Sequence, residues 1–186
     1  MFSEKIIQTG MKLLSINLTS VFVFFNLIAL SQSSDNNKGK ALFVYNFAKY
    51  IQWPDDADAE VFTIGVLGQK EVYDGLTKLC EQKQINGVPI VVRIVDDPEK
   101  ISDCKIIYIS RNQNLFFKDM FGLIGNEKIL LVAEGKEMIK QGADISMIKQ
   151  GNQLAFEINK EAINKKGLSV PNELMILAIN MDKRVF

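Results

Sequence analysis

The sequence predicts one α/β domain, a sandwich in which a mixed, mainly parallel sheet of five or six strands carries helices on both faces. Short apolar runs rich in β-branched residues alternate with helical patterns up to about residue 141, which indicates crossover units and parallel pairing. Two period-two segments then flank Gly151-Asn152, a hairpin signal that adds an antiparallel edge. The chain has 186 residues, enough to bury a core.

The first predicted element is an aromatic helix in KALFVYNFAKYIQWP, residues 40–54. At helical spacing, Phe43, Phe47 and Tyr50 form one apolar row, and Val44, Ala48 and Ile51 form a second row beside it. The residue before a proline is disfavoured in the helical region, so Pro54 ends the helix. We expect this helix either to anchor the core or to dock one face on a partner.

The later elements follow from periodicity and turn residues. Strands are expected at 61–68, 88–95, 105–110 and 128–134, and in the two halves of the hairpin, 143–150 and 153–159. Helices are expected at 69–82, 112–124, 135–141 and 160–166, and after Pro171. In the helix at 112–124, the pattern places Leu115, Phe116, Met120 and Leu123 inward; in the last helix it places Leu174, Leu177 and Ala178 inward.

The N-terminal 31 residues have the layout of a secretory signal peptide. From Met11, one lysine is followed by an apolar run that is densest from Val21 to Leu30, and Ala29-Leu30-Ser31 supplies small residues before a cleavage point. Met11 is the expected start. Polar residues interrupt the run, which makes it short for a membrane span, although an uncleaved anchor is the alternative. We therefore expect cleavage after Ser31, a polar linker at 32–39, a folded domain at 40–186 and export of the mature chain.

Composition excludes several function classes. The chain has 22 basic and 22 acidic residues, which argues against a nucleic-acid surface or a polybasic membrane patch. It has no histidine, which removes Ser-His-Asp and Cys-His catalysis and His-ligated metal sites.

The remaining motifs have ordinary explanations. Gly65 to Gly68 lacks the third glycine of a dinucleotide fingerprint and the lysine of a phosphate loop, so a tight turn is favoured. The acidic run Asp55–Glu60 lacks the glycine and final ligand of a calcium loop. Asp96-Asp97 before a proline fits a plain turn. We expect no catalytic residue, cofactor or metal, and hence no enzyme.

Two cysteines, Cys80 and Cys104, leave two alternatives open. An oxidising compartment favours a disulfide, and both residues end or begin elements at one edge of the predicted sheet. Two buried thiols are the other interpretation, because sequence does not give the separation of the Cα atoms.

LAFEIN, residues 154–159, ends an apolar strand with two polar residues. Leu154, Phe156 and Ile158 share one face, which puts Glu157 on the opposite, outward face. Asn159 fits the N-cap of the following helix.

Several stretches in fixed order resemble the YfiR family of periplasmic regulators. They are Lys40-Ala41 through Lys49 with Trp53-Pro54, the strand FTIGVLG at 62–68, Cys104 before a strand ending at Ile109-Ser110, FEIN at 156–159, Gly167-Leu168, and Leu174–Ala178. The match covers about 140 residues. It departs from the family at Val170-Pro171 and Leu174-Met175, and it has two cysteines where some relatives form two disulfides.

The resemblance implies a small, exported, non-enzymatic protein. The best-known members bind the periplasmic sensory domain of an inner-membrane diguanylate cyclase and hold it inactive; release raises cyclic di-GMP and promotes biofilm formation. Other relatives lie beside, or are fused to, sensor histidine kinases. A homodimer is a further expectation, because regulators of dimeric receptors often pair.

We therefore expect a regulator that binds a membrane signalling protein by surface complementarity. The candidate contacts are Glu157, Asn159 and Ile163, with Ile163 expected to be an exposed apolar residue among charged neighbours. The alternative is a small-ligand binder in which Tyr50, Trp53 and Tyr73 line an aromatic pocket.

Overall fold

The computed structural model describes residues 36–53, 60–97, 100–125 and 127–178. The predicted signal peptide, Pro54, and the acidic residues Asp55, Asp56 and Asp58 lie outside these residues. No helix in the described part of the chain combines the length and the apolar content that a membrane span needs.

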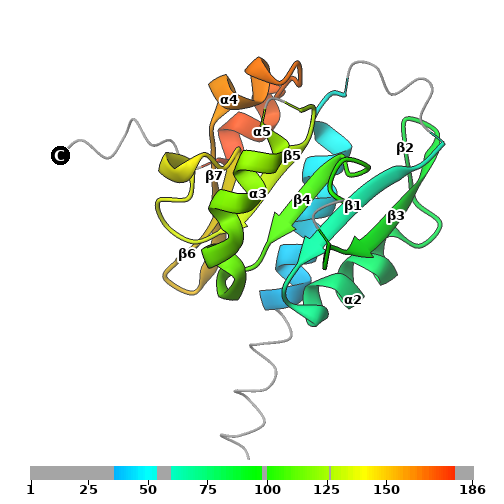
Figure 1. The fold of residues 1–186 in the computed structure, drawn as a ribbon, viewed down its shortest axis with the longest axis horizontal. Helices are drawn as coiled ribbons and strands as arrows, with labels where there is room; N and C mark the ends of the chain where they lie inside the picture. Colours follow the sequence, from blue (N-terminus) through cyan, green and yellow to red (C-terminus); the bar gives the residue numbers. More distant parts are fainter. Residues whose placement is uncertain (1–35, 54–59, 98–99, 126, 179–186) are drawn as a thin grey trace, which may run out of the picture. The chain divides into compact units, whose positions relative to one another are not determined.

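Seven strands form one mixed sheet, one or two more than the sequence predicts (Figure 1). Their order is β2-β3-β1-β4-β5-β6-β7. The five central strands β3, β1, β4, β5 and β6 run parallel, and β2 and β7 are antiparallel to their neighbours. The bounds are β1 Phe62–Leu67, β2 Gln84–Ile85, β3 Val88–Ile94, β4 Ile106–Ile109, β5 Leu130–Glu134, β6 Ile145–Gln150 and β7 Gln153–Ile158.

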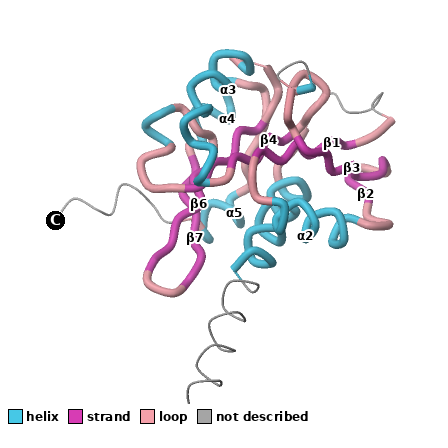
Figure 2. The backbone as a smooth tube through the Cα atoms, turned by 60° about the horizontal axis from the view of Figure 1, so that its bottom comes forward, coloured by secondary structure: helices cyan, strands magenta, loops and turns pink. Residues whose placement is uncertain are grey.

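The helices cover both faces of this sheet, as predicted. The N-terminal helix occupies residues 36–50. The others are α2 Lys70–Cys80, α3 Phe117–Ile124, α4 Lys160–Lys165 and α5 Asn172–Leu177, with short 3-10 helices η2 Arg111–Phe116 and η3 Ile139–Gln141. Figure 2 shows α3 on one side of the row of strands, and α2 and α5 on the other. Residues 36–39, predicted as linker, are already helical even though Gly39 disfavours a helix interior.

Two hydrophobic cores follow from the alternation of side chains along the strands. The larger core joins the N-terminal helix, α2, α4 and α5 to one set of strand positions, which includes Phe62, Ile64, Ile106, Tyr108, Leu130 and Val132. The smaller core packs α3 on the opposite set, Ile107, Ile109, Leu131 and Ala133. Strands β1, β4 and β5 are buried on both faces, which explains why they are almost continuously apolar.

The aromatic helix anchors the larger core. Phe47 is fully buried, and both Phe43 and Phe47 contact the ring of Phe156 on β7, edge to face, with centroids 5.2 and 5.1 Å apart. Tyr50 is the exception in the predicted row, because it is half exposed at the end of the helix.

Three sequence predictions about elements need correction. β2 was not predicted, because two residues carry no periodic signal. Met120 is buried as predicted, but Leu115, Phe116 and Leu123 are exposed. Phe117 and Ile124 face the smaller core in their place, because the segment to Phe116 is a 3-10 helix and shifts the phase of the helix that follows. Leu177 is also exposed, whereas Leu174 and Ala178 are buried as predicted.

Candidate partner-binding surface and the polar cluster beneath it

The exposed side of η2 and α3 carries an unusual concentration of large apolar side chains. Leu115 is 91% exposed, and Phe116, Leu123 and Phe121 are 52%, 55% and 40% exposed. We call these four residues the η2–α3 ridge. Single exposed apolar residues are normal, but a group of four within nine residues is typical of a protein interaction surface.

The inner side of the same segment fixes its position. Phe117, Met120 and Ile124, spaced three and four residues apart, pack into the smaller core. The ring of Phe121 stacks on that of Phe117 at 6.3 Å and lies against Gly142, where an added Cβ would sit 2.6 Å from the ring. The ridge is therefore presented by a helix whose other face is firmly packed.

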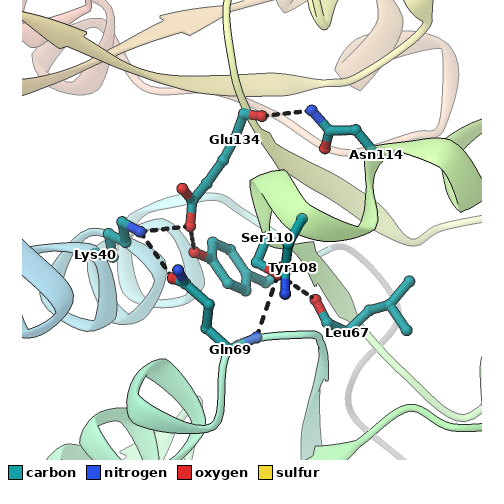
Figure 3. Close-up of polar contacts among 8 residues, drawn as sticks. Lys40, Leu67, Gln69, Tyr108, Ser110, Asn114 and Glu134 are labelled. Atoms are coloured by element: carbon teal, nitrogen blue, oxygen red, sulfur yellow. Dashed lines mark hydrogen bonds and ion pairs between the residues drawn. The ribbon is translucent and has the colours of Figure 1, made fainter.

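A buried polar cluster lies under η2, at the carboxyl ends of the parallel strands (Figure 3). Lys40 of the N-terminal helix places its Nζ 2.8 Å from Glu134 Oε1 at the end of β5 and donates to Gln69 Oε1 at 2.9 Å. The hydroxyl of Tyr108 on β4 donates to the same Glu134 oxygen. Both charged side chains are only 7% exposed, so this ion pair is shielded from water.

Hydrogen bonds connect this cluster to η2. Asn114 Nδ2, within η2, donates to the main-chain oxygen of Glu134 at 2.9 Å. Ser110, which immediately precedes η2, donates from Oγ to Leu67 O at 3.1 Å and accepts from Gln69 N at 3.2 Å. The 3-10 turn that carries Leu115 and Phe116 is thus held by the ends of β1, β4 and β5.

Burial dominates the electrostatics of Glu134. Removal from water disfavours the charged carboxylate and raises the pKa of Glu134 above its usual range. The hydrogen bond and charge of Lys40 oppose this change, and the charge of Lys149 on β6 opposes it more weakly.

The cluster occupies the topological switch point of the sheet. The chain leaves β1 toward β3 on one side and later enters β4 on the other, and ligands of open α/β sheets bind outside the carboxyl ends of such strands. Here side chains fill that position. Gly68, at φ +112°, makes the tight turn that the sequence predicts, and a Cβ there would lie 1.8 Å from Ser110 Oγ. The Gly65–Gly68 run therefore serves close packing.

None of the three predicted contact residues belongs to the ridge. Ile163 is fully buried in the larger core, so its predicted exposure is wrong; it lies on the side of α4 that faces the sheet. Glu157 is on the opposite face of β7 from Phe156, as expected, but it is buried rather than exposed. Asn159 caps α4 as predicted, its Oδ1 accepting from Ala162 N at 3.0 Å. Whether these residues bind a partner stays a prediction.

The two cysteines are free and buried, which corrects the disulfide alternative. Cys80 belongs to the larger core and Cys104 to the smaller core, so the sheet separates them. Burial raises the pKa of each thiol to about 11. The sequence placed both at one sheet edge but gave no information about the face.

The three aromatic residues predicted to share one pocket line two separate cavities. Tyr50 and Trp53 line one cavity of about 580 Å³ together with Ser169 and Pro171. Tyr73 lines a different cavity of about 510 Å³ between α2 and the β2–β3 hairpin. Among the described residues, no three Cys, Asp or Glu side chains gather in a way that could hold a metal ion.

Sequence reasoning missed both the ridge and the polar cluster. The spacing of Phe117, Met120 and Ile124 was a usable signal, because assigning these three to the core leaves Leu115, Phe116 and Leu123 outside. No comparable signal marks the cluster.

Solved structures match this chain only weakly. A structure described as the ABC domain in complex with L-Trp from Streptococcus pneumoniae matches at 13% identity and a TM-score of 0.46 over 63% of this chain. A conserved domain protein from Vibrio cholerae O1 biovar eltor matches at 14% identity and a TM-score of 0.42 over 62% of this chain. The match spans about half the length of those chains, 54% and 53%.

The family comparison is far more extensive. The model of the DUF4154 family, described as YfiR/HmsC-like, matches residues 37–179, which include every described strand and almost the whole described fold. This agrees with the resemblance found in the ordered sequence motifs. The chain belongs to the YfiR/HmsC-like family.

Proposed function

We propose that this chain is a periplasmic regulatory protein that binds the periplasmic sensory domain of an inner-membrane signalling protein, a diguanylate cyclase, and holds it inactive. Family membership supports this proposal, because YfiR-like proteins are regulators rather than enzymes. Export by the N-terminal 31 residues and control of cyclic di-GMP and biofilm formation belong to the same proposal. A sensor histidine kinase is the alternative partner.

The η2–α3 ridge is the single observation that carries the proposal. Interfaces gain most of their affinity from a few apolar and aromatic side chains that become fully desolvated, surrounded by a polar rim. Leu115 and Phe116 are the most suitable residues, because they are exposed in the free protein and stand on a rigid support. Lys118 and Asp119, both exposed, provide rim charges on the same segment.

The regulator acts by differential binding. A partner that interconverts between inactive and active arrangements is held inactive when the regulator binds the inactive one more tightly. A shift from mostly active to mostly inactive needs roughly a 10⁴-fold difference in affinity. A preformed apolar ridge contributes to that difference only if one of the two partner arrangements offers a matching apolar groove.

Capture from membranes tests the proposal. Tagged protein is incubated with detergent-solubilised membranes, and the bound proteins are identified by mass spectrometry. We expect a cyclase or a histidine kinase with a periplasmic domain, and we expect Leu115→Asp to reduce its recovery at least tenfold. The matched control is Ile176→Asp on α5, which changes a residue of similar exposure outside the ridge.

Two results would contradict the proposal. Equal loss with both variants would show that the ridge has no special role. Capture of no signalling protein, under conditions that preserve a known periplasmic pair, would remove the regulator itself. Size measurement of the same sample tests the proposed homodimer.

A second candidate, a small-ligand binder, has one specific observation in its favour. The 580 Å³ cavity next to Tyr50 and Trp53 combines a half-exposed aromatic ring with a buried one, and pockets of this size hold small organic ligands. Screening small periplasmic metabolites by melting temperature tests it, because a ligand that binds only the folded state raises that temperature. A Tyr50→Ala variant should lose the increase.

A further inference from the structure

We propose that the Lys40–Glu134 pair is a proton-sensitive contact that couples the seating of the N-terminal helix to the η2–α3 ridge. The inference deepens the proposed function and rests on it for its biological meaning, since it concerns the regulation of the same surface. The coupling itself is a property of this chain and is measurable without a partner.

The first reason is that the pair is more than a stability device. Buried ion pairs often contribute no more than apolar residues of the same volume, because two charges must be desolvated. Lys40 and Glu134 nevertheless lie 2.8 Å apart with side chains that are each only 7% exposed. Glu134 also accepts from Tyr108, and Lys40 also donates to Gln69, so the pair is part of a network rather than an isolated contact.

The second reason is that two short routes lead from Lys40 to η2. One route runs through Glu134, whose main-chain oxygen accepts from Asn114, the residue directly before Leu115. The other route runs through Gln69, whose side chain accepts from Lys40 and whose main-chain nitrogen donates to Ser110 Oγ. Both routes end on the turn that supports Leu115 and Phe116 (Figure 3).

The third reason is the arrangement of charge around the carboxylate. The charged or titratable groups that face Glu134 are Lys40 from the N-terminal helix, Tyr108 from β4 and, more distantly, Lys149 from β6. The neutral polar groups beside it are Gln69 at the start of α2 and Asn114 in η2. Lys40 is the cation in direct contact, so its position responds most strongly to the charge of Glu134.

The direction of the response follows from linkage. Lys40 lowers the pKa of Glu134, so the arrangement with Lys40 withdrawn has the higher pKa and binds a proton more tightly. Acidification therefore shifts the population toward withdrawn Lys40 and a loosened start of the N-terminal helix. When the carboxylate is ionised, it holds Lys40 in place and, through Lys40, the side chain of Gln69, and with them the base of the ridge.

Hydrogen exchange measured by mass spectrometry at pH 7.5 and 5.5 tests the coupling, after correction for the intrinsic dependence of exchange on pH. In the wild-type chain we expect exchange in both 36–45 and 111–124 to rise roughly fivefold or more at the lower pH, the lower limit of typical coupling between sites. Glu134→Gln, a neutral isostere, should show this faster hydrogen exchange in both segments at both pH values. The control, Glu161→Gln, changes an exposed carboxylate paired with Lys165 and should behave as wild type.

Three outcomes would overturn the inference. Faster exchange in 36–45 with none in 111–124 would show that the two segments are independent. A pH response that persists in Glu134→Gln would assign it to another group. An absence of any response in the wild-type chain, which requires no variant to fold, would remove the switch altogether.

Capture of the membrane partner at the two pH values separates this inference from the proposed function. Coupled exchange with no partner captured at either value would leave the coupling established and the function wrong. A partner captured equally at pH 7.5 and 5.5 by a chain without coupled exchange would establish the function and refute the coupling. Coupled exchange with capture reduced at pH 5.5 would support both.

Discussion

Two buried ion pairs among the described residues lie at opposite ends of the parallel strands and are held in different ways. At the amino ends of the strands, Asp144 Oδ2 accepts from Lys166 Nζ at 2.6 Å and from Leu131 N at 2.7 Å, and Lys166 donates to Ile129 O at 3.0 Å. At the carboxyl ends of the strands, Glu134 accepts a hydrogen bond from the side chain of Tyr108, and Lys40 donates one to the side chain of Gln69.

The two ion pairs differ in their additional hydrogen-bond partners, which are main-chain atoms for Asp144 and Lys166 and side chains for Glu134 and Lys40. Main-chain atoms of β5 cannot move without breaking the ladder, so Asp144 and Lys166 clamp the end of α4 to the sheet. Side-chain partners can turn to other rotamers at modest cost, so the contacts of the Lys40–Glu134 cluster rearrange more easily. Similar burial of two ion pairs therefore does not imply a similar role.

The largest effect should come from Lys166→Met. It leaves Asp144, a fully buried carboxylate, without its cation, and breaking a buried pair in this way typically costs about 3–5 kcal/mol. Urea unfolding measures the loss. The neighbouring Lys165→Met removes an exposed i,i+4 partner of Glu161 and should stay within about 0.5 kcal/mol of wild type. Similar losses for the two variants would refute the clamp.

Lys40→Met should be less damaging, about 1–3 kcal/mol, because Glu134 keeps the hydroxyl of Tyr108 and can take up a proton. The control is Lys49→Met, an exposed lysine on the same helix. If urea unfolding showed that Lys40→Met lowers the free energy of unfolding as much as Lys166→Met does, the two ion pairs would be equally important for stability, contrary to this expectation.

The elements of the fold were largely predictable, because both signals used are local. Buried apolar runs marked β1, β4 and β5, and Gly151-Asn152 marked the hairpin of β6 and β7. The error at Leu115 and Phe116 came from assuming one continuous α-helix through a 3-10 turn.

The polar cluster could not be predicted in the same way. Lys40, Gln69, Tyr108 and Glu134 come from four elements, and each has an ordinary surface or turn interpretation when read alone. Only the strand order β3-β1-β4-β5 brings their carboxyl ends together. The faces of Cys80 and Cys104 were unpredictable for the same reason.

A smaller effect is expected in the pH dependence of Glu134→Gln. Because burial raises the pKa of folded Glu134, its stabilising contribution is present below the ordinary value of 4.5 and is lost as pH rises through the folded pKa. The variant lacks this loss. Its free energy of unfolding, relative to wild type, should therefore increase from pH 4 to pH 7.5 in a urea series. A constant difference would show that Glu134 titrates normally.

The smallest effect concerns the two thiols, which lie on opposite faces of the sheet. Cys104 lies two residues before β4 in the smaller core, Cys80 ends α2 in the larger core, and burial raises the pKa of each thiol to about 11. Thiolate is the reactive form, so native protein should react slowly with a thiol reagent, and denatured protein should give two thiols per chain. A reductant should leave the melting temperature unchanged. A decrease would indicate a bond between these residues, and since the sheet separates them in this fold, one of the two cores would have to be arranged differently.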